Sequence, residues 1–412
     1  MKQTAILLSI LTFGLGVALA QAPAPNANGR GPARGGMFGG PGVKSPEVAQ
    51  DGSVTFRLRA PNAKEVFVTI NGRTAMTKDE SGVWSATTKQ MEPDFYPYNF
   101  LVDGMNIADP ANPIVKSIVT GGFQSFVHVP GPASLAWELA DVPHGQVTRQ
   151  LFHSAIIGDD RDFYVYTPPN YDASGKTQYP VLYLLHGFTD DASAWMTAGR
   201  ANIILDNLIA QGKAKPMIIV NPLGYGVPNP AAGLGAVMGE SERHFRDYTK
   251  SLLEEVIPMV EKGYRVSKDR NSRAIAGLSM GGAETFYAGL NHVDKFSYVA
   301  GMSSAFVMYP RPSAAPAPAP GAPGGPRPPT DPAIFSKAFP AFDAKAASQL
   351  KLLYVACGSE DGLISGSRDF REYLKSKNIT ATAVETPGAH TWMVWRRNLI
   401  EIAPMLFQKA KN

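Results

Sequence analysis

The chain has only one cysteine, Cys357, so no disulfide can form within it. A single thiol cannot supply a zinc or iron–sulfur cluster, and the seven histidines show no H-E-x-x-H spacing, so we expect no metal and no cofactor. The chain also lacks a basic block, and its net charge of +4 is spread along its length, which argues against a nucleic-acid partner. What remains is chemistry that ordinary side chains can perform, in a chain of 412 residues that is 44% hydrophobic and can bury a large core.

Residues 1–20, "MKQTAILLSILTFGLGVALA", have the pattern of a signal peptide. Lys2 supplies the positive charge, an apolar run follows, and Ala18-Leu19-Ala20 fits a cleavage site before Gln21. The alternative is an uncleaved anchor, for which the apolar run is short. We therefore expect an exported protein, periplasmic or extracellular, with no membrane span after cleavage.

Composition and periodicity divide the rest of the chain. Residues 21–43 are rich in Gly and Pro and predict a linker. Residues 44–131 alternate apolar and polar residues in short runs, as in "SVTFRLRAPNAKEVFVTI", which predicts a small all-β sandwich. Its stretches "VTIN", "GVWSATT" and "DFYPYNFLVDGMNIADPANP" resemble immunoglobulin-like modules related to glycogen- and starch-binding domains. The aromatic residues there either stack on sugar or fill the core of the sandwich, and the core is the favoured interpretation for Trp84, Tyr96 and Tyr98.

After a connector at residues 132–150, the hydrophobic pattern of the sequence changes in residues 151–412. Short apolar runs such as "VLYLLHG", "RAIAGLS" and "KLLYVACG" alternate with amphipathic stretches such as "ERHFRDYTKSLLEEVIPMVEKGY", in which Pro258 should kink a helix. This alternation predicts an α/β domain with a mainly parallel sheet covered on both faces. The Pro/Ala-rich segment 309–332 predicts an extended loop, which could lean over a pocket.

The stretch "RAIAGLSMGGAETF" places Ser279 between two glycines, after a buried strand and before a helix. This context favours a nucleophilic serine on a tight strand-to-helix turn, in which Gly277 and Gly281 avoid crowding. Ser303 in "AGMSSAF" also follows an apolar strand, but Ala305 replaces the second glycine, so we place Ser303 at the edge of the site at most.

A serine nucleophile needs a base, an acid and donors for an oxyanion. His390 follows a strand-like run in "ETPGAHTW", and Asp361 follows an earlier one in "ACGSEDGL", with Glu360 as the competing acid. The backbone N–H groups of Met280 and Phe188 are the expected donors, and we expect His186 to bind backbone.

The stretches "LYLLHGFTDDASAW", "RAIAGLSMGG", "GSEDGL" and "GAHTWMVWRRNL" resemble the esterase D group of α/β-hydrolases. The resemblance covers residue 151 to the C-terminus and implies a serine esterase with Ser279, His390 and Asp361 as its triad. The N-terminal module resembles that of feruloyl and acetyl xylan esterases, which implies an ester substrate linked to a plant polysaccharide. Trp195, Tyr225 and Trp392 are candidates for stacking on it.

Three alternatives stay open at this point: an enterochelin-type or general carboxylesterase, an acyltransferase, and a glycan-binding protein on a hydrolase scaffold. The sequence leaves the oligomeric state open.

Overall fold

The computed structural model describes residues 42–310 and 330–408. The expected signal peptide, nearly all of the linker and most of the Pro/Ala-rich loop lie outside these ranges. None of the helices within the described ranges is long and apolar enough to cross a membrane.

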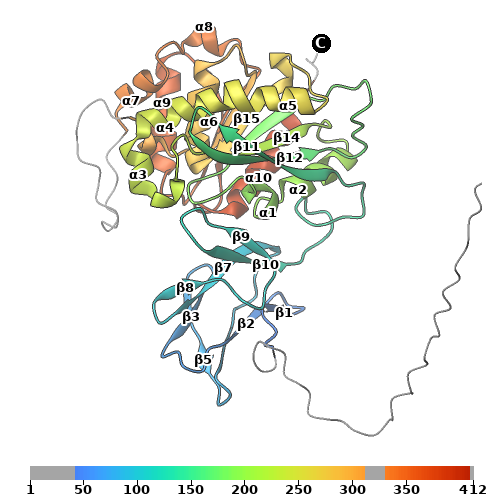
Figure 1. Cartoon of the computed structure of the whole chain (residues 1–412), viewed down its shortest axis with the longest axis vertical. Helices are drawn as coiled ribbons and strands as arrows, with labels where there is room; N and C mark the ends of the chain where they lie inside the picture. Colours follow the sequence, from blue (N-terminus) through green and yellow to red (C-terminus); the bar gives the residue numbers. More distant parts are fainter. Residues whose placement is uncertain (1–41, 311–329, 409–412) are drawn as a thin grey trace, which may run out of the picture. The chain divides into compact units, whose positions relative to one another are not determined.

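The N-terminal part forms two antiparallel sheets, which we call the N-terminal sheets (Figure 1). The first has the order β1-β2-β6-β5, and the second has the order β4-β3-β7-β10-β9, with β8 paired to β7. Their bounds are β1 Glu47–Val48, β2 Val54–Arg59, β3 Val66–Thr69, β4 Arg73–Ala75, β5 Thr77–Lys78, β6 Val83–Thr87, β7 Asp94–Val102, β8 Met105–Ile107, β9 Val115–Ser117 and β10 Phe123–Val129.

One apolar core joins the two N-terminal sheets, because alternate residues of β2, β3, β7 and β10 are buried together. The three aromatic residues considered for sugar stacking belong to it, being 7%, 5% and 1% exposed (Trp84, Tyr96, Tyr98). Their polar atoms bind inside this part of the chain, at Ala60, Glu92 and Asp109. The core interpretation of these residues is confirmed.

A sheet of eight strands follows, with the order β11-β12-β14-β13-β15-β16-β17-β18. β11 and β12 are antiparallel to their neighbours, and the strands from β14 to β18 run parallel. The carboxyl ends of the parallel strands therefore meet at one edge, where a site is expected. The bounds are β11 Gln146–Ser154, β12 Asp159–Thr167, β13 Val181–Leu185, β14 Ile218–Pro222, β15 Arg273–Leu278, β16 Tyr298–Met302, β17 Leu352–Gly358 and β18 Thr382–Thr386.

Helices cover both faces of this sheet, as continuous apolar strands require (Figure 1). One core contains residues of α4, α6, α7 and α9, and the other contains residues of α1, α2 and α10. The expected α/β architecture is confirmed. The helices are α1 Ala194–Thr197, α2 Ala201–Ala210, α3 Leu234–Gly239, α4 Ser241–Ser251, α5 Ile257–Gly263, α6 Ser279–Asn291, α7 Pro332–Ala338, α8 Ala344–Ala347, α9 Ile364–Ser376 and α10 Trp392–Ile402, with short helical turns η1 Pro230–Ala232, η2 Leu252–Val256, η3 Arg270–Ser272, η4 Phe306–Met308 and η5 Ala403–Met405.

The helix interrupted by Pro258 adjusts through a change of helical pitch. η2, which lies between α4 and α5 and ends two residues before Pro258, is a π-helical turn. A proline has no N–H to donate to the carbonyl of the residue four positions earlier, so one helical hydrogen bond is lost at Pro258. The wider π turn accommodates this change within the helix.

The N-terminal sheets pack directly against the larger sheet's helices. Phe95 and Phe126 stack on one another and belong to the same core as α10. Arg396 of α10 is fully buried and donates to the Asp94 carboxylate at 2.6 Å and to the Phe95 carbonyl at 2.8 Å.

Candidate active site

Ser279 lies at the sharp turn between β15 and α6, with a φ of 53°. A Cβ at Gly277 would collide with the backbone of Gly281, and a Cβ at Gly281 would collide with the carbonyl of His186. Both glycines are therefore required by close backbone approach, as the sequence predicted. A non-glycine residue at positive φ costs on the order of 1–3 kcal/mol, which the surrounding structure must offset.

Three side chains from three loops meet at this turn. Ser279 Oγ lies 3.0 Å from His390 Nε2, and His390 Nδ1 lies 2.7 Å from Asp361 Oδ2. Asp361 follows β17 and His390 follows β18, so all three loops leave the same edge of the sheet. The exposed Glu360 makes no side-chain hydrogen bond to the described part of the chain. The structure thus brings together Ser279, His390 and Asp361.

The Asp361 carboxylate is buried but well supplied with donors. Burial alone would raise its pKa, but hydrogen bonds from His390 and Ser303 and from the Leu363 N–H outweigh this, so the pKa of Asp361 lies below its usual value. The carboxylate is therefore ionised at neutral pH. In that state it accepts a hydrogen bond from His390 Nδ1 and leaves Nε2 free to accept a proton from Ser279.

The loop after β13 approaches the serine from the other side. A Cβ at Gly187 would lie 2.7 Å from Leu278 Cδ1 and 3.3 Å from Ser279 Cβ, and the Gly281 N–H donates to the His186 carbonyl at 3.0 Å. Gly187 is therefore needed for close approach, and its loop lies beside Ser279.

Residues Gly187–Asp190 of this loop form a turn closed by an Asp190 N–H to Gly187 carbonyl bond of 3.2 Å. The N–H groups of Phe188, within this turn, and of Met280, in the first turn of α6, have no acceptor among the described residues. They are thus available to a bound oxygen. We call Gly187–Asp190 the oxyanion turn, after the role that the sequence predicts for Phe188.

Two buried histidines hold the next loop along the sheet edge, residues 223–227. His186 Nε2 accepts from the Gly224 N–H at 2.9 Å, and His244 Nδ1 accepts from the Gly226 N–H at 3.1 Å. Burial lowers the pKa of His186, and it lowers that of His244 to about 3, so both rings are neutral. The expected backbone-binding role of His186 is confirmed, whereas His244 gave no signal in the sequence.

A carboxyl group lies behind the nucleophile, next to His244. Glu284 of α6 has Oε1 3.0 Å from His244 Nε2, and both side chains are completely buried. Burial raises the pKa of Glu284 well above its usual value. The pair has no exposed surface and is part of the support beneath the site.

The three aromatic residues expected to stack on substrate are buried instead. Trp195 and Tyr225 are fully enclosed, and Trp392 is 5% exposed. Trp195 Nε1 donates to the Leu185 carbonyl at 2.9 Å, and the Tyr225 hydroxyl donates to the Asp190 carbonyl at 3.0 Å. The stacking expectation is corrected, because these side chains point into the core and support the loops of the site.

The sequence placed Ser303 at the edge of the site at most, but the structure places it in contact with Asp361. Ser303 has a φ of 47°, is completely buried, and receives the Trp395 Nε1–H at 3.1 Å. The ring of Trp395 in turn packs edge-on against His390, with centroids 4.9 Å apart. Ser303 therefore contacts Asp361, and Trp395 contacts His390. The only signal was the position of Ser303 after a parallel strand.

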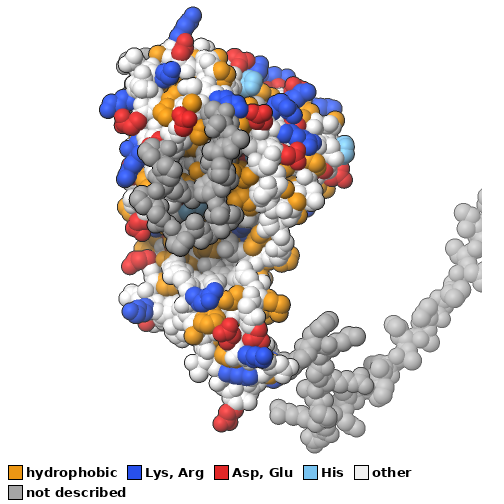
Figure 2. Space-filling model, turned by 90° about the vertical axis from the view of Figure 1, so that its left-hand side faces the viewer, with side chains coloured by type: hydrophobic (Ala, Val, Ile, Leu, Met, Phe, Trp, Pro, Cys, Tyr) orange, Lys and Arg blue, Asp and Glu red, His pale blue; other side chains and the backbone are white. Residues whose placement is uncertain are grey.

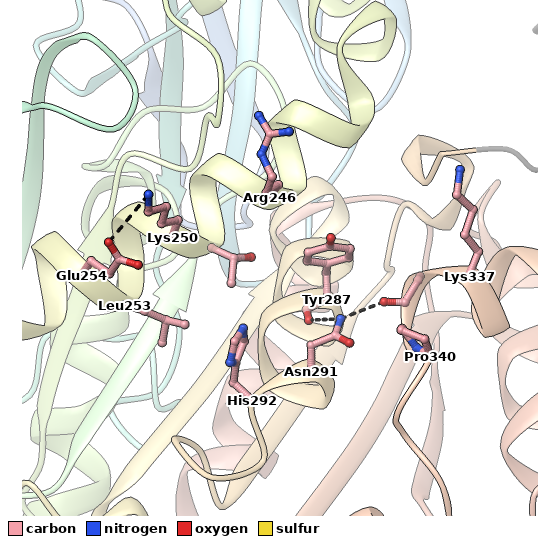
Figure 3. A pocket seen from close by; sticks show the side chains of 11 residues that line it. Arg246, Lys250, Leu253, Glu254, Tyr287, Asn291, His292, Lys337 and Pro340 are labelled. Atoms are coloured by element: carbon pink, nitrogen blue, oxygen red, sulfur yellow. Dashed lines mark hydrogen bonds and ion pairs between the residues drawn. The ribbon is translucent and has the colours of Figure 1, made fainter.

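A cavity on the described part of the chain lies away from the serine. A hollow of about 350 Å³ is lined by side chains of α4, η2, α6 and α7, including Arg246, Lys250, Tyr287 and Lys337 (Figure 3). Tyr287 lies about two turns along α6 from Ser279. The three cationic side chains that line the hollow each form an ion pair with a neighbouring carboxylate: Arg246 with Asp247, Lys250 with Glu254 and Lys337 with Glu242.

Nothing among the described residues suggests a resident metal or a strongly charged surface. No group of three or more His, Cys, Asp or Glu residues could hold a metal ion within that part of the chain. Figure 2 shows positive and negative side chains interspersed over the described part of the face that it draws.

Comparison with known proteins places the chain in a family. The Esterase family model matches residues 154–406. An endo-1,4-beta-xylanase/feruloyl esterase of Xylanibacter ruminicola is 31% identical over 380 residues, which is 89% of this chain and 46% of that protein. Esterase Rv1288 of Mycobacterium tuberculosis is 27% identical over 58% of this chain and 55% of its own length. The chain thus spans about half or less of these relatives.

Two solved structures share the fold. The enterobactin esterase of Shigella flexneri superimposes with a TM-score of 0.62 at 19% identity, covering 86% of this chain and 92% of that one. A ferulic acid esterase of Anaeromyces mucronatus superimposes with a TM-score of 0.53 at 22% identity, covering 67% and 96%. The matched region, residues 154–406, includes Ser279 and the turn that carries it. The chain belongs to the Esterase family.

Proposed function

We propose that this chain is an exported serine esterase that hydrolyses carboxylic esters through an acyl-enzyme. The observation that carries the proposal is the continuous hydrogen-bonded series Ser279–His390–Asp361 at the strained turn. His390 Nε2 removes the proton as Ser279 Oγ attacks the ester carbonyl, and the same nitrogen returns it to the leaving alcohol. Asp361 orients the ring and stabilises its charged form. Water then attacks the acyl-enzyme by the same route.

The oxygen that becomes negative during attack is stabilised by the N–H groups of Met280 and Phe188. Met280 lies in the first turn of α6, where the helix dipole also favours negative charge. Donors fixed by the fold do not need to reorganise during the reaction. Stabilisation of the oxyanion by such donors is therefore a large part of the rate enhancement.

For the substrate, we propose feruloyl or acetyl esters on a plant polysaccharide such as xylan. The support is the Xylanibacter ruminicola relative named as a xylanase/feruloyl esterase, which aligns over 89% of this chain. We also propose that residues 44–131 are an immunoglobulin-like domain that belongs to the enzyme rather than an independent sugar-binding module, because its aromatic side chains are committed to its core. Export rests on residues 1–20.

The first test is whether Ser279 is the nucleophile. Ser279→Ala should lower turnover of nitrophenyl acetate by about 10⁶-fold, by analogy with the loss of other serine triads. A fluorophosphonate probe should label the wild-type protein and not the variant. Full activity of a pure, folded Ser279→Ala protein would contradict the proposal.

The second test separates substrate classes in one panel of methyl ferulate, acetylated xylan, a ferric catecholate ester and short nitrophenyl esters. We expect the first two to be cleaved with the highest kcat/KM. Cleavage of the catecholate ester alone would favour an enterochelin-type esterase, and product analysis with added sugar acceptors would reveal an acyltransferase. Sugar binding without probe labelling would leave a non-enzymatic glycan-binding protein.

A further inference from the structure

We infer that the N-terminal sheets are part of the catalytic centre, because Lys116 of β9 is a positioning residue that holds the oxyanion turn in its working shape. This inference rests on the proposed function, since it concerns the donor at Phe188. It adds a residue from outside the catalytic α/β part of the chain to the machinery that stabilises the oxyanion.

The contact between β9 and the turn is an ion pair in a dry environment. Lys116 Nζ binds Asp190 Oδ1, and the two side chains are 2% and 8% exposed. Lys116 Nζ also donates to the Ser117 carbonyl at 3.4 Å. A buried charge must be paired, so Lys116 and Asp190 require one another in the folded protein.

A second contact reaches the turn one residue earlier. The Val119 N–H, just after β9, donates to the Thr189 carbonyl at 2.8 Å. Val119 is also half-buried against the core that contains α4 and α6. Successive residues of the oxyanion turn, Thr189 and Asp190, are thus each bound by the N-terminal sheets, and β9 contacts α1 beside them (Figure 1).

The turn needs this support because its backbone is strained. Thr189 has a φ of 75°, a region that a β-branched residue rarely adopts. Strained residues persist only where the surrounding structure fixes them, and they occur at working sites. The residue held in this way, Thr189, directly follows Phe188, whose N–H must point at the substrate oxygen.

The α/β part of the chain supplies some of the support, but not all of it. The Tyr225 hydroxyl donates to the Asp190 carbonyl, and the His186 carbonyl receives the Gly281 N–H. These bonds fix the two ends of the loop, His186 and Asp190. The Thr189 carbonyl and the Asp190 carboxylate are bound by β9 and Val119.

Removal of the ion pair should loosen the turn and reduce catalysis more than substrate binding. A donor displaced by about 1 Å costs on the order of 10²-fold in rate. For Lys116→Met we expect kcat on nitrophenyl acetate to fall 10- to 100-fold while KM changes less than about 3-fold, because the ground-state carbonyl needs the donor less than the oxyanion does. Binding of a trifluoromethyl ketone, which forms an oxyanion on Ser279, should weaken by a similar factor.

Two further variants make the test decisive. Lys116→Met/Asp190→Asn removes both charges and should fold, since it leaves no unpaired buried ion, but it should keep the defect in kcat. Asn207→Ala is the matched control: Asn207 of α2 donates to the Ala136 and Glu138 carbonyls of the connector, so it ties the connector to α2 through bonds that do not involve the turn. It should lower the melting temperature and leave kcat unchanged.

Wild-type kcat in a folded double variant, or an equal loss of kcat in Asn207→Ala, would overturn the inference. A failure of the proposed function itself is distinguishable, because Ser279→Ala would then match the wild-type protein in the same assay.

Discussion

At the scale of single residues, the acid of the candidate triad is the assignment that the structure sharpens most. The sequence left Asp361 and Glu360 as competitors, since both follow the same strand and no pattern separates adjacent carboxylates. The structure pairs Asp361 with His390 at 2.7 Å and leaves Glu360 exposed. The difference comes from backbone geometry in the turn after β17, which residue order alone does not specify.

Asp361→Asn should lower turnover by about 10⁴-fold, because an amide cannot hold the imidazole in the tautomer that accepts the Ser279 proton. Glu360→Gln is the matched control and should leave turnover within about 2-fold, since this side chain is exposed and makes no hydrogen bond to the described residues. Steady-state kinetics on a nitrophenyl ester measures both. The opposite ranking would move the acid to Glu360.

The aromatic residues show where prediction from sequence fails at this scale. Trp195 and Tyr225 were expected in the pocket because each follows a strand that ends at the catalytic edge. Position after a strand does not fix the direction of a side chain, and burial of two large rings contributes several kcal/mol when they turn inward. Both rings do so here.

At the scale of elements, the strand–turn–helix unit β15–α6 was predictable almost completely. The apolar run, the two glycines and the helix-forming residues are adjacent in sequence, so local patterns capture them. Its neighbours were predictable only in part: the loop at residues 186–190 was expected to approach through Phe188, whereas the contact of residues 303–305 with the turn was not expected. Such contacts depend on strand order, which is absent from local patterns.

Gly281→Ala should destabilise the protein and abolish activity, although alanine normally favours a helix. Its Cβ would lie 2.7 Å from the carbonyl carbon of Leu185, so the loop carrying Phe188 must move. We expect a loss of about 1–3 kcal/mol in the free energy of unfolding, measured with urea.

The matched control for that change is Gly235→Ala in α3, where an added Cβ has nothing within 4 Å. It should leave activity unchanged and stabilise the helix by about 0.5–1 kcal/mol. If both substitutions behaved alike, close approach would not be the reason for Gly281.

At the scale of the whole molecule, the buried histidines make stability depend on pH. In the unfolded chain a histidine titrates near pH 6.5, whereas burial lowers the pKa of His244 to about 3 and also lowers that of His186. Above about pH 6.5 both states are neutral at these sites. As pH falls from there toward 3, the unfolded state takes up protons that the folded state excludes.

The free energy of unfolding should therefore decrease by up to about 1.4 kcal/mol per pH unit for each of these histidines below about pH 6. Glu284, beside His244, contributes with the opposite sign, because burial raises its pKa and the unfolded chain releases this proton more readily. Urea unfolding at pH 7, 6 and 5 measures the net slope of the wild-type protein. His244→Asn should reduce it, because asparagine takes up no proton. An unchanged slope in a folded His244→Asn protein would show that His244 does not contribute to it.

The organisation of the chain into an all-β part and an α/β part was predictable from composition and periodicity. The contacts that join the two were not. Lys116 and Asp94 look like ordinary solvent-facing charges, and their partners lie 74 and 302 residues further along the chain. The burial of such a charged residue depends on an oppositely charged residue far away in the sequence. A single sequence does not reveal which residue that is.

The ion pair between Asp94 and Arg396 has a consequence for the order in which the protein is made. Asp94 and Phe95 leave the ribosome early, and the helix that neutralises and covers them comes 302 residues later. Until then Asp94 of β7 lacks both of its counter-charges, Arg396 and Arg397. Closing so long a loop is slow compared with forming local structure. The N-terminal sheets are synthesised first, but they gain the ion pair with Arg396 only after α10 has been made. A chain truncated before α10 therefore leaves Asp94 without this partner.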